Sequence, residues 1–277
     1  MADKIRQMVA CGKLYPSDKE MLNNMTDIQP DNKGEVNAII VPEGSYKTAL
    51  DCYKSAYSTV AGKHYDTVVI ISPMHNFSFP AIALTKYDKW ASPFGEIAVD
   101  TEANDILHKF RSEYIYCLTS QYESKFAGEF SAEVQLPFIY KTFGADTKIV
   151  PIIMGENNTK FTIMLANALN ALLEDGIKND KKYLIVVTTN LSEKAKFEDA
   201  IIKDTNFAKI MCEMKPDRFS EQLALGTIAA HGGGGVTVLL RLAEKTEWKN
   251  INVLKTYNTG DITDNKLEVD GYIAACL

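Results

Sequence analysis

The sequence predicts a single-domain α/β protein with a mainly parallel central sheet flanked by helices on both faces. Short apolar runs without polar alternation recur along the chain, and stretches with helical periodicity separate them. No repeat, low-complexity linker or change in composition marks a boundary within residues 1–277. Parallel strands covered on both faces are apolar throughout, and strands that alternate with helices favour such a sheet.

Four continuous apolar runs, rich in β-branched residues, predict the strands of this sheet. They occupy residues 36–42, 66–73, 147–155 and 183–190. Each is followed by a polar or Gly/Pro-containing turn, and runs of this length without alternation are typical of strands buried on both faces. The final segment predicts a strand, a loop and a closing strand within residues 251–277.

The predicted helices lie between these runs. In residues 46–60, apolar side chains recur at three- and four-residue steps, and residues 159–174 show the same pattern. Thr159 is a candidate cap for the second of these helices. Three further helices are predicted over residues 198–214, 216–226 and 235–245.

Composition restricts the classes of protein to which the chain can belong. The net charge is -6 and no basic stripe is present, which argues against nucleic-acid binding. No apolar run approaches the roughly 20 residues that cross a bilayer, and the first residues lack the apolar stretch of a secretory signal. The five cysteines are scattered without a C-x-x-C pair, which argues against disulfides and a thiolate zinc site. We therefore expect a cytoplasmic protein that binds neither nucleic acid nor membrane.

Polar residues that follow the predicted strands are candidates for a functional site, because ligands of open α/β sheets bind at the carboxyl ends of strands. Glu43 follows the first strand, His75 the second, and Asn190 and Glu193 the fourth. Glu43, His75 and Glu193 together would make a site for Fe, Mn or Zn. The alternative is that both glutamates face solvent and that His75 bonds to the backbone of a turn.

His231 directly precedes four consecutive glycines, which open a predicted helix. Backbone N–H groups at such a position can bind anions. The run lacks the lysine and Ser/Thr of a P-loop, so a permissive turn or a close backbone approach is the better interpretation. The sequence contains no G-x-S-x-G, H-E-x-x-H or kinase signature.

A set of short motifs extends in order from residue 9 to the C-terminus. The segments are 9–22, 41–46, 71–76, 91–102, 129–140, 148–155, 186–193 and 270–277. This ordered set resembles the Memo family, which includes AmmeMemoRadiSam system protein B. The family segments include Pro-His-Ala-Gly-Tyr, Gly-Pro-Ser-His, Thr-Pro-Leu-Gly-x-x-x-Val-Asp and Glu-His-Ser-Leu-Glu-Val-Gln-Leu-Pro-Phe. The resemblance implies a fold similar to class III extradiol dioxygenases, which use non-haem iron, and a cleft with histidines and a cysteine.

Several positions of that implied cleft depart from the family pattern. Glu43 and Glu193 stand where the family has histidines, and Phe130 replaces a third. Asn190 stands for an aspartate and Ala229 for the cysteine. The family's second histidine is kept as His75, and its glutamate is kept as Glu133. The candidate cleft residues are Glu43, His75, Phe130, Glu133, Asn190, Glu193, Ala229 and His231.

Because Phe and Ala cannot donate to a metal, the resemblance predicts a degenerate metal site without a cofactor. The first hypothesis is a non-catalytic binding or scaffold protein, with an unknown protein or small-molecule partner and no identified catalytic residue. The second is a metal-dependent enzyme, oxidoreductase- or hydrolase-like, that uses a remodelled Glu43/His75/Glu193 site for Fe, Mn or Zn, with His231 compensating in part. A third is an anion or phospho-ligand near residues 232–235.

Overall fold

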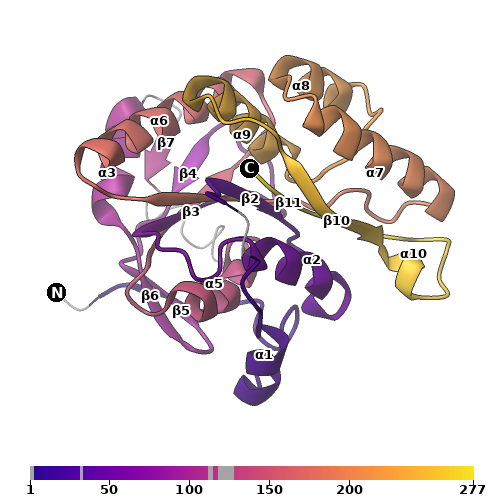
Figure 1. Ribbon diagram of the computed structural model, residues 1–277, viewed down its shortest axis with the longest axis horizontal. Helices are drawn as coiled ribbons and strands as arrows, with labels where there is room; N and C mark the ends of the chain where they lie inside the picture. The colour runs from indigo at the N-terminus through magenta and orange to yellow at the C-terminus, as the bar shows by residue number, and fades with distance from the viewer. Residues whose placement is uncertain (1–2, 32–33, 112–114, 118–127) are drawn as a thin grey trace.

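An eight-stranded sheet, with strand order β10-β11-β2-β9-β3-β8-β4-β7, forms the centre of the computed structural model (Figure 1). The structure describes residues 3–31, 34–111, 115–117 and 128–277. The strands of this sheet are β2 (Ala38–Val41), β3 (Thr67–Pro73), β4 (Ile82–Leu84), β7 (Ile115–Cys117), β8 (Lys148–Met154), β9 (Tyr183–Thr188), β10 (Asn252–Asn258) and β11 (Gly271–Cys276).

The middle of this sheet is parallel and its edges are mixed. The neighbours β2, β9, β3 and β8 all run in one direction, and they contain the four predicted apolar runs. At one edge, β11 is antiparallel to β2 and to β10. At the other, β4 is antiparallel to β8 and parallel to β7. The sheet is therefore continuously parallel in its middle, as predicted for buried apolar strands, and carries antiparallel neighbours toward both edges.

Helices cover both faces of the sheet (Figure 1). One face packs against α3 (Thr101–Arg111), α6 (Thr159–Lys178), α7 (Phe197–Cys212), α8 (Pro216–Ala224) and α9 (Gly233–Thr246). The other packs against α1 (Lys19–Met25), α2 (Tyr46–Ser58), α5 (Leu136–Phe143) and a small sheet of β1 (Ile5–Arg6), β5 (Lys89–Ser92) and β6 (Gly95–Ala98). Two short elements complete the described chain, the 3-10 helix η1 (Glu133–Gln135) and α10 (Thr259–Ile262).

The strand β3 shows why the apolar runs lack alternation. Successive side chains of a strand point to opposite faces of the sheet. Val69 and Ile71 join the core on the α6 and α9 side, whereas Val68 and Ile70 join the core on the α2 and α5 side. All four are fully buried. A sheet with two covered faces therefore requires apolar residues at every position.

The structure identifies the residues that cap two of the predicted helices. Ser45 caps α2, and its hydroxyl accepts a hydrogen bond from the backbone N–H of Lys47. The α6 cap is Asn158, whose side chain accepts from the Lys160 N–H, so the assignment of Thr159 as the cap was wrong by one residue.

Among the described residues, no helix is long and apolar enough to cross a membrane.

Candidate metal centre

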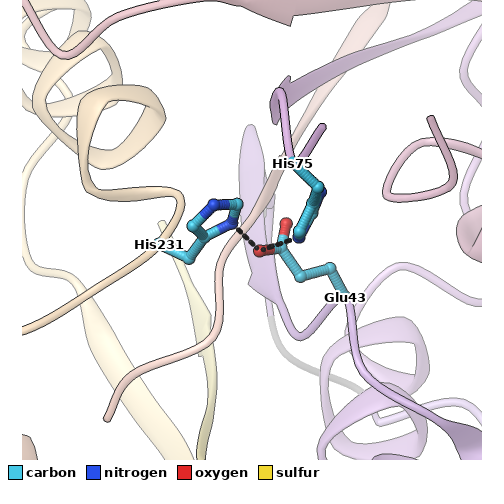
Figure 2. A group of neighbouring side chains, drawn as sticks. All are labelled: Glu43, His75 and His231. Atoms are coloured by element: carbon cyan, nitrogen blue, oxygen red, sulfur yellow. Dashed lines mark hydrogen bonds and ion pairs between the residues drawn. The ribbon is translucent and has the colours of Figure 1, made fainter. Parts of the chain in front are cut away.

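Three side chains from distant parts of the chain meet at the carboxyl end of the parallel strands. Glu43 lies two residues after β2, and His75 lies two residues after β3. His231 lies two residues before α9. Figure 2 shows the two imidazoles on either side of the Glu43 carboxylate, with both interactions ending on one of its oxygens. The site therefore occupies the edge of the sheet where function was expected.

The distances within this cluster are short. Glu43 Oε1 lies 2.9 Å from His231 Nδ1 and 3.3 Å from His75 Nε2. One potential ligand atom from each residue lies within 4.8 Å of those of the other two. Glu43 is fully buried, whereas His75 and His231 are 18% and 29% exposed. The carboxylate is therefore held inside the protein, and the imidazoles form the solvent-facing side.

The glycines after His231 let the start of α9 approach the sheet. A Cβ on Gly232 would lie 2.0 Å from the Thr188 carbonyl oxygen, and one on Gly235 would lie 3.0 Å from Val187. Neither glycine has a positive φ, so their role is the close approach and not an unusual turn. This contact between α9 and β9 brings His231 to the carboxyl end of the sheet.

The same turn is poorly suited to bind an anion, because its backbone donors are engaged within the protein. The Gly232 N–H donates to Thr189 Oγ1, and the Gly233 N–H donates to the Ala230 carbonyl. The Gly235 N–H donates to the Gly232 carbonyl. Pairing of three of the four glycine N–H groups therefore weakens the anion hypothesis for residues 232–235, since anion sites need unpaired N–H groups.

A second buried carboxylate orients His75 from behind. Glu129 is 2% exposed, and its Oε1 accepts from His75 Nδ1 at 3.0 Å. Its other oxygen accepts from the His75 backbone N–H at 2.8 Å. The backbone N–H groups of Phe130 and Ser131 and the Ser131 hydroxyl also donate to Glu129 Oε1. This arrangement fixes the imidazole ring with Nε2 toward Glu43.

The hydrogen bonds determine which protons the cluster holds without a metal. Burial alone would lower the pKa of His75, but its contacts with Glu129 and Glu43 raise the pKa from 6.5 to about 10. Burial alone would raise the pKa of Glu43, but the bonds from His231 and His75 hold that pKa below its ordinary value. Burial alone would also raise the pKa of Glu129, but its hydrogen bonds with His75 and Ser131 lower that pKa to about 2. An imidazolium between two carboxylates is the resulting state, because ionised carboxylates only accept.

Two other cleft candidates support the cluster without facing it as ligands. Phe130 packs beside His75, with ring centroids 4.3 Å apart. Asn190 Oδ1 accepts from the Glu43 backbone N–H, and its carbonyl accepts from the backbone N–H of His231. Thr188, which the sequence did not single out, donates its hydroxyl to Glu43 Oε2. Asn190 thus holds the loop of Glu43 and the turn of His231 together.

The remaining candidates lie outside the cluster. Glu193 is exposed, so the structure places His231, not Glu193, beside Glu43 and His75. Ala229 is half-buried and lies two residues before His231. Glu133 is fully buried but bonds to Arg6 at 2.7 Å, away from the three-residue group. The search for polar residues after each strand did not reveal the third member, because His231 precedes a helix and not a strand end.

Comparison with known proteins assigns the chain to a family. The Memo-like protein family matches residues 6–276. The chain is 25% identical to a MEMO1 family protein of Thermoplasma volcanium and 27% identical to one of Methanococcoides burtonii, with 98% of each chain covered. It is 31% identical to a MEMO1 family protein of Thermotoga petrophila over 76% of this chain and 71% of that one.

The chain belongs to the Memo family.

The donor set of this Memo protein fits a divalent transition metal. Two imidazoles and one carboxylate suit Fe, Mn and Zn. Bonds of about 2.1 Å place neighbouring donors roughly 3.0 to 3.5 Å apart, and the separations here are 2.9 and 3.3 Å. A carboxylate on the far nitrogen of a metal-binding histidine is also the usual arrangement. The donors that hold protons in this cluster are therefore also potential metal ligands.

The sequence analysis did not identify Glu129, although this residue begins the 129–140 segment that resembles the family. Glu129 is separated from His75 by 54 residues, and no local spacing links the two. The available signal was an acidic residue in an otherwise apolar, buried segment. Buried carboxylates are rare without a partner, so such a residue indicates a hydrogen-bonded network.

Proposed function

We propose that this Memo-family protein binds a divalent transition metal (Fe, Mn or Zn) through Glu43, His75 and His231. The observation that carries the proposal is the convergence of the three donors, which lie within 4.8 Å of one another at the carboxyl end of the sheet. His231 supplies the donor that was expected from Glu193. The loss of other family positions therefore remodels the site and need not abolish it.

The charges of the cluster support the same proposal. Glu43 and Glu129 place two negative charges in a buried region, and such charges must be balanced. In the structure, the His75 imidazolium lies between them and balances one of them. A divalent ion held by neutral imidazoles would balance both, since it carries two positive charges. Metal and protons therefore compete for this site, and acid weakens metal binding.

We extend the proposal to a fold related to class III extradiol dioxygenases and to an enzyme of oxidoreductase or hydrolase type. Two histidines and one carboxylate are the ligands of many non-haem iron oxygenases and leave other coordination positions open. A metal so held would act as a Lewis acid toward an oxygen-containing ligand. The exposed sides of His75 and His231 would face that ligand, and Phe130 would shield one side.

The second candidate is a metal-free binding or scaffold protein with an unidentified protein or small-molecule partner. One observation favours it. Glu43 already accepts hydrogen bonds from His231 and Thr188, and it forms an ion pair with His75. The cluster is thus satisfied without a metal, and it would serve only to hold β2, β3 and α9 together.

Elemental analysis of protein purified without chelators distinguishes the two candidates. We expect about one equivalent of Fe, Mn or Zn, and its loss in Glu43→Ala, His75→Ala and His231→Ala. Glu193→Ala is the matched control, because it removes a glutamate from the neighbouring loop and should keep the metal. Protein without metal, which also retains none after incubation with Fe²⁺, Mn²⁺ or Zn²⁺ and desalting, would support the scaffold.

A further inference from the structure

We infer that Arg6 is a positioning residue for the metal centre, acting through Glu129 from the N-terminal strand. The inference rests on the proposed function for its metal readout. Arg6 lies in β1 and is 4% exposed. Its guanidinium stacks over the Trp90 ring, with Cζ 4.1 Å from the ring centroid. A buried arginine in this position needs partners for its donors, and one of these partners belongs to Glu129, which contacts His75.

The guanidinium bridges two points of one segment. Nη1 donates to Glu133 Oε2 at 2.7 Å, and Nη2 donates to the backbone carbonyl of Glu129. A guanidinium presents its donors in a rigid planar fork, so the two acceptors are held at a fixed separation. Arg6 thereby fixes the backbone of the residue whose side chain orients His75.

Glu133 reinforces this clamp from the other side. Its carboxylate accepts from the backbone N–H groups of Val9 and Ala10 and from the Tyr15 hydroxyl, as well as from Arg6. Docking of the N-terminal segment and placement of Glu129 therefore depend on one ion pair. The path runs from Arg6 through the Glu129 backbone to the Glu129 carboxylate and then to the His75 ring.

The local bonds of Glu129 define the alternative. Its carboxylate also accepts from Phe130, Ser131 and His75 N–H groups, all of which remain if Arg6 is changed. If those bonds alone fix the carboxylate, Arg6 contributes only to stability. An experiment must therefore measure the His75 ring itself, as well as unfolding.

The test uses Arg6→Lys and Arg6→Met in the full chain, with Tyr15→Phe as the matched control. Tyr15→Phe removes one donor from Glu133 without touching Glu129. We would follow the NMR signals of His75 Nδ1 and its proton in ¹⁵N-labelled, metal-free protein. The His75→Gln variant assigns these signals. Affinity for Co²⁺ would be measured separately by absorption titration.

We expect Arg6→Lys to fold, since it keeps a cation beside Glu133 while losing the fork. The His75 Nδ1 proton signal should shift or broaden in it, and more so in Arg6→Met. The dissociation constant for Co²⁺ should rise about tenfold, the loss typical for a group that orients a ligand. Tyr15→Phe should leave both readouts at their wild-type values.

An unchanged His75 signal and unchanged Co²⁺ affinity in a destabilised Arg6→Lys protein would overturn the inference. If the wild-type protein binds no metal, the proposed function fails, but the NMR comparison in the metal-free protein still decides the role of Arg6. If Arg6→Met does not fold, Arg6→Lys alone decides it.

Discussion

Glu43 and Glu133 are both fully buried glutamates, yet their partners differ in kind. Glu133 accepts from a guanidinium, two backbone N–H groups and a tyrosine hydroxyl. Glu43 accepts from His231 and a threonine hydroxyl and pairs with His75. Guanidinium and amide groups cannot give up their protons near neutral pH, whereas imidazoles can and then become metal donors.

Under the proposed function, this difference separates a structural carboxylate, Glu133, from a metal-binding one, Glu43, although both are buried. A guanidinium fixes its partner permanently, and the pair then serves to dock the N-terminal segment. Imidazoles make the charge of their partner exchangeable, because each can release a proton and bind a metal in its place. Variants at the two glutamates should therefore differ in which property they change.

The largest effect is expected from Glu133→Gln. This variant leaves the Arg6 guanidinium buried without its counter-ion, which costs about 3–5 kcal/mol of unfolding free energy. Glu43→Gln should cost less, about 1–2 kcal/mol, because His75 keeps Glu129 as a counter-ion and can also lose a proton. Urea unfolding of the metal-free proteins at pH 8 measures both. Equal losses for the two variants would contradict the distinction between the two sites.

The next effect concerns metal affinity and the orienting carboxylate. Glu129→Gln keeps an acceptor near His75 Nδ1 but removes its charge, which makes the imidazole a weaker donor to a metal. We expect the affinity for Co²⁺ or Zn²⁺ to fall between about tenfold and hundredfold. Competition titration against a chelator of known affinity measures it. Ser78→Ala, which removes an exposed hydroxyl that bonds to Glu156, is the control and should leave affinity unchanged.

A smaller effect is expected in the pH dependence of stability. The pKa of His75 is about 10 in the folded protein and has an ordinary value of 6.5. Its stabilising contribution is therefore fully present below pH 6.5 and is lost as pH rises through 10. The stability difference between wild type and His75→Gln should shrink by about 2 kcal/mol from pH 6.5 to 8 in urea unfolding of metal-free protein, and it should continue to shrink toward pH 10. A constant difference would show that His75 is neutral in the cluster.

The sequence predicted the sheet better than the site, for physical reasons. Burial on both faces demands apolar residues at every position, so the strands β2, β3, β8 and β9 were visible as continuous runs. Glu43 and His75 followed from the rule that sites lie beyond the ends of parallel strands. These features are local to the chain and leave a local signal.

The third member of the cluster, His231, and the residues around it were not predictable in the same way. His231 reaches the site only because α9 packs against β9 through its glycines, a contact between distant segments. Glu193 follows its strand as Glu43 does, but its side chain faces solvent. Glu129 joins His75 across the fold. No spacing in the chain encodes such contacts, because they depend on the packing of whole elements.

The smallest effect is expected from removing one hydroxyl that donates a hydrogen bond to each of the two glutamates. Thr188→Val and Tyr15→Phe preserve shape and delete a single donor to Glu43 and to Glu133. Each should cost about 1 kcal/mol of unfolding free energy, the usual value for one buried hydrogen bond. Only Thr188→Val should also change metal affinity, by a few-fold, because Glu43 is a proposed ligand and Glu133 is not. Chemical denaturation and Co²⁺ titration measure the two properties, and a change of affinity in Tyr15→Phe as large as that in Thr188→Val would show that the two carboxylates act as one unit.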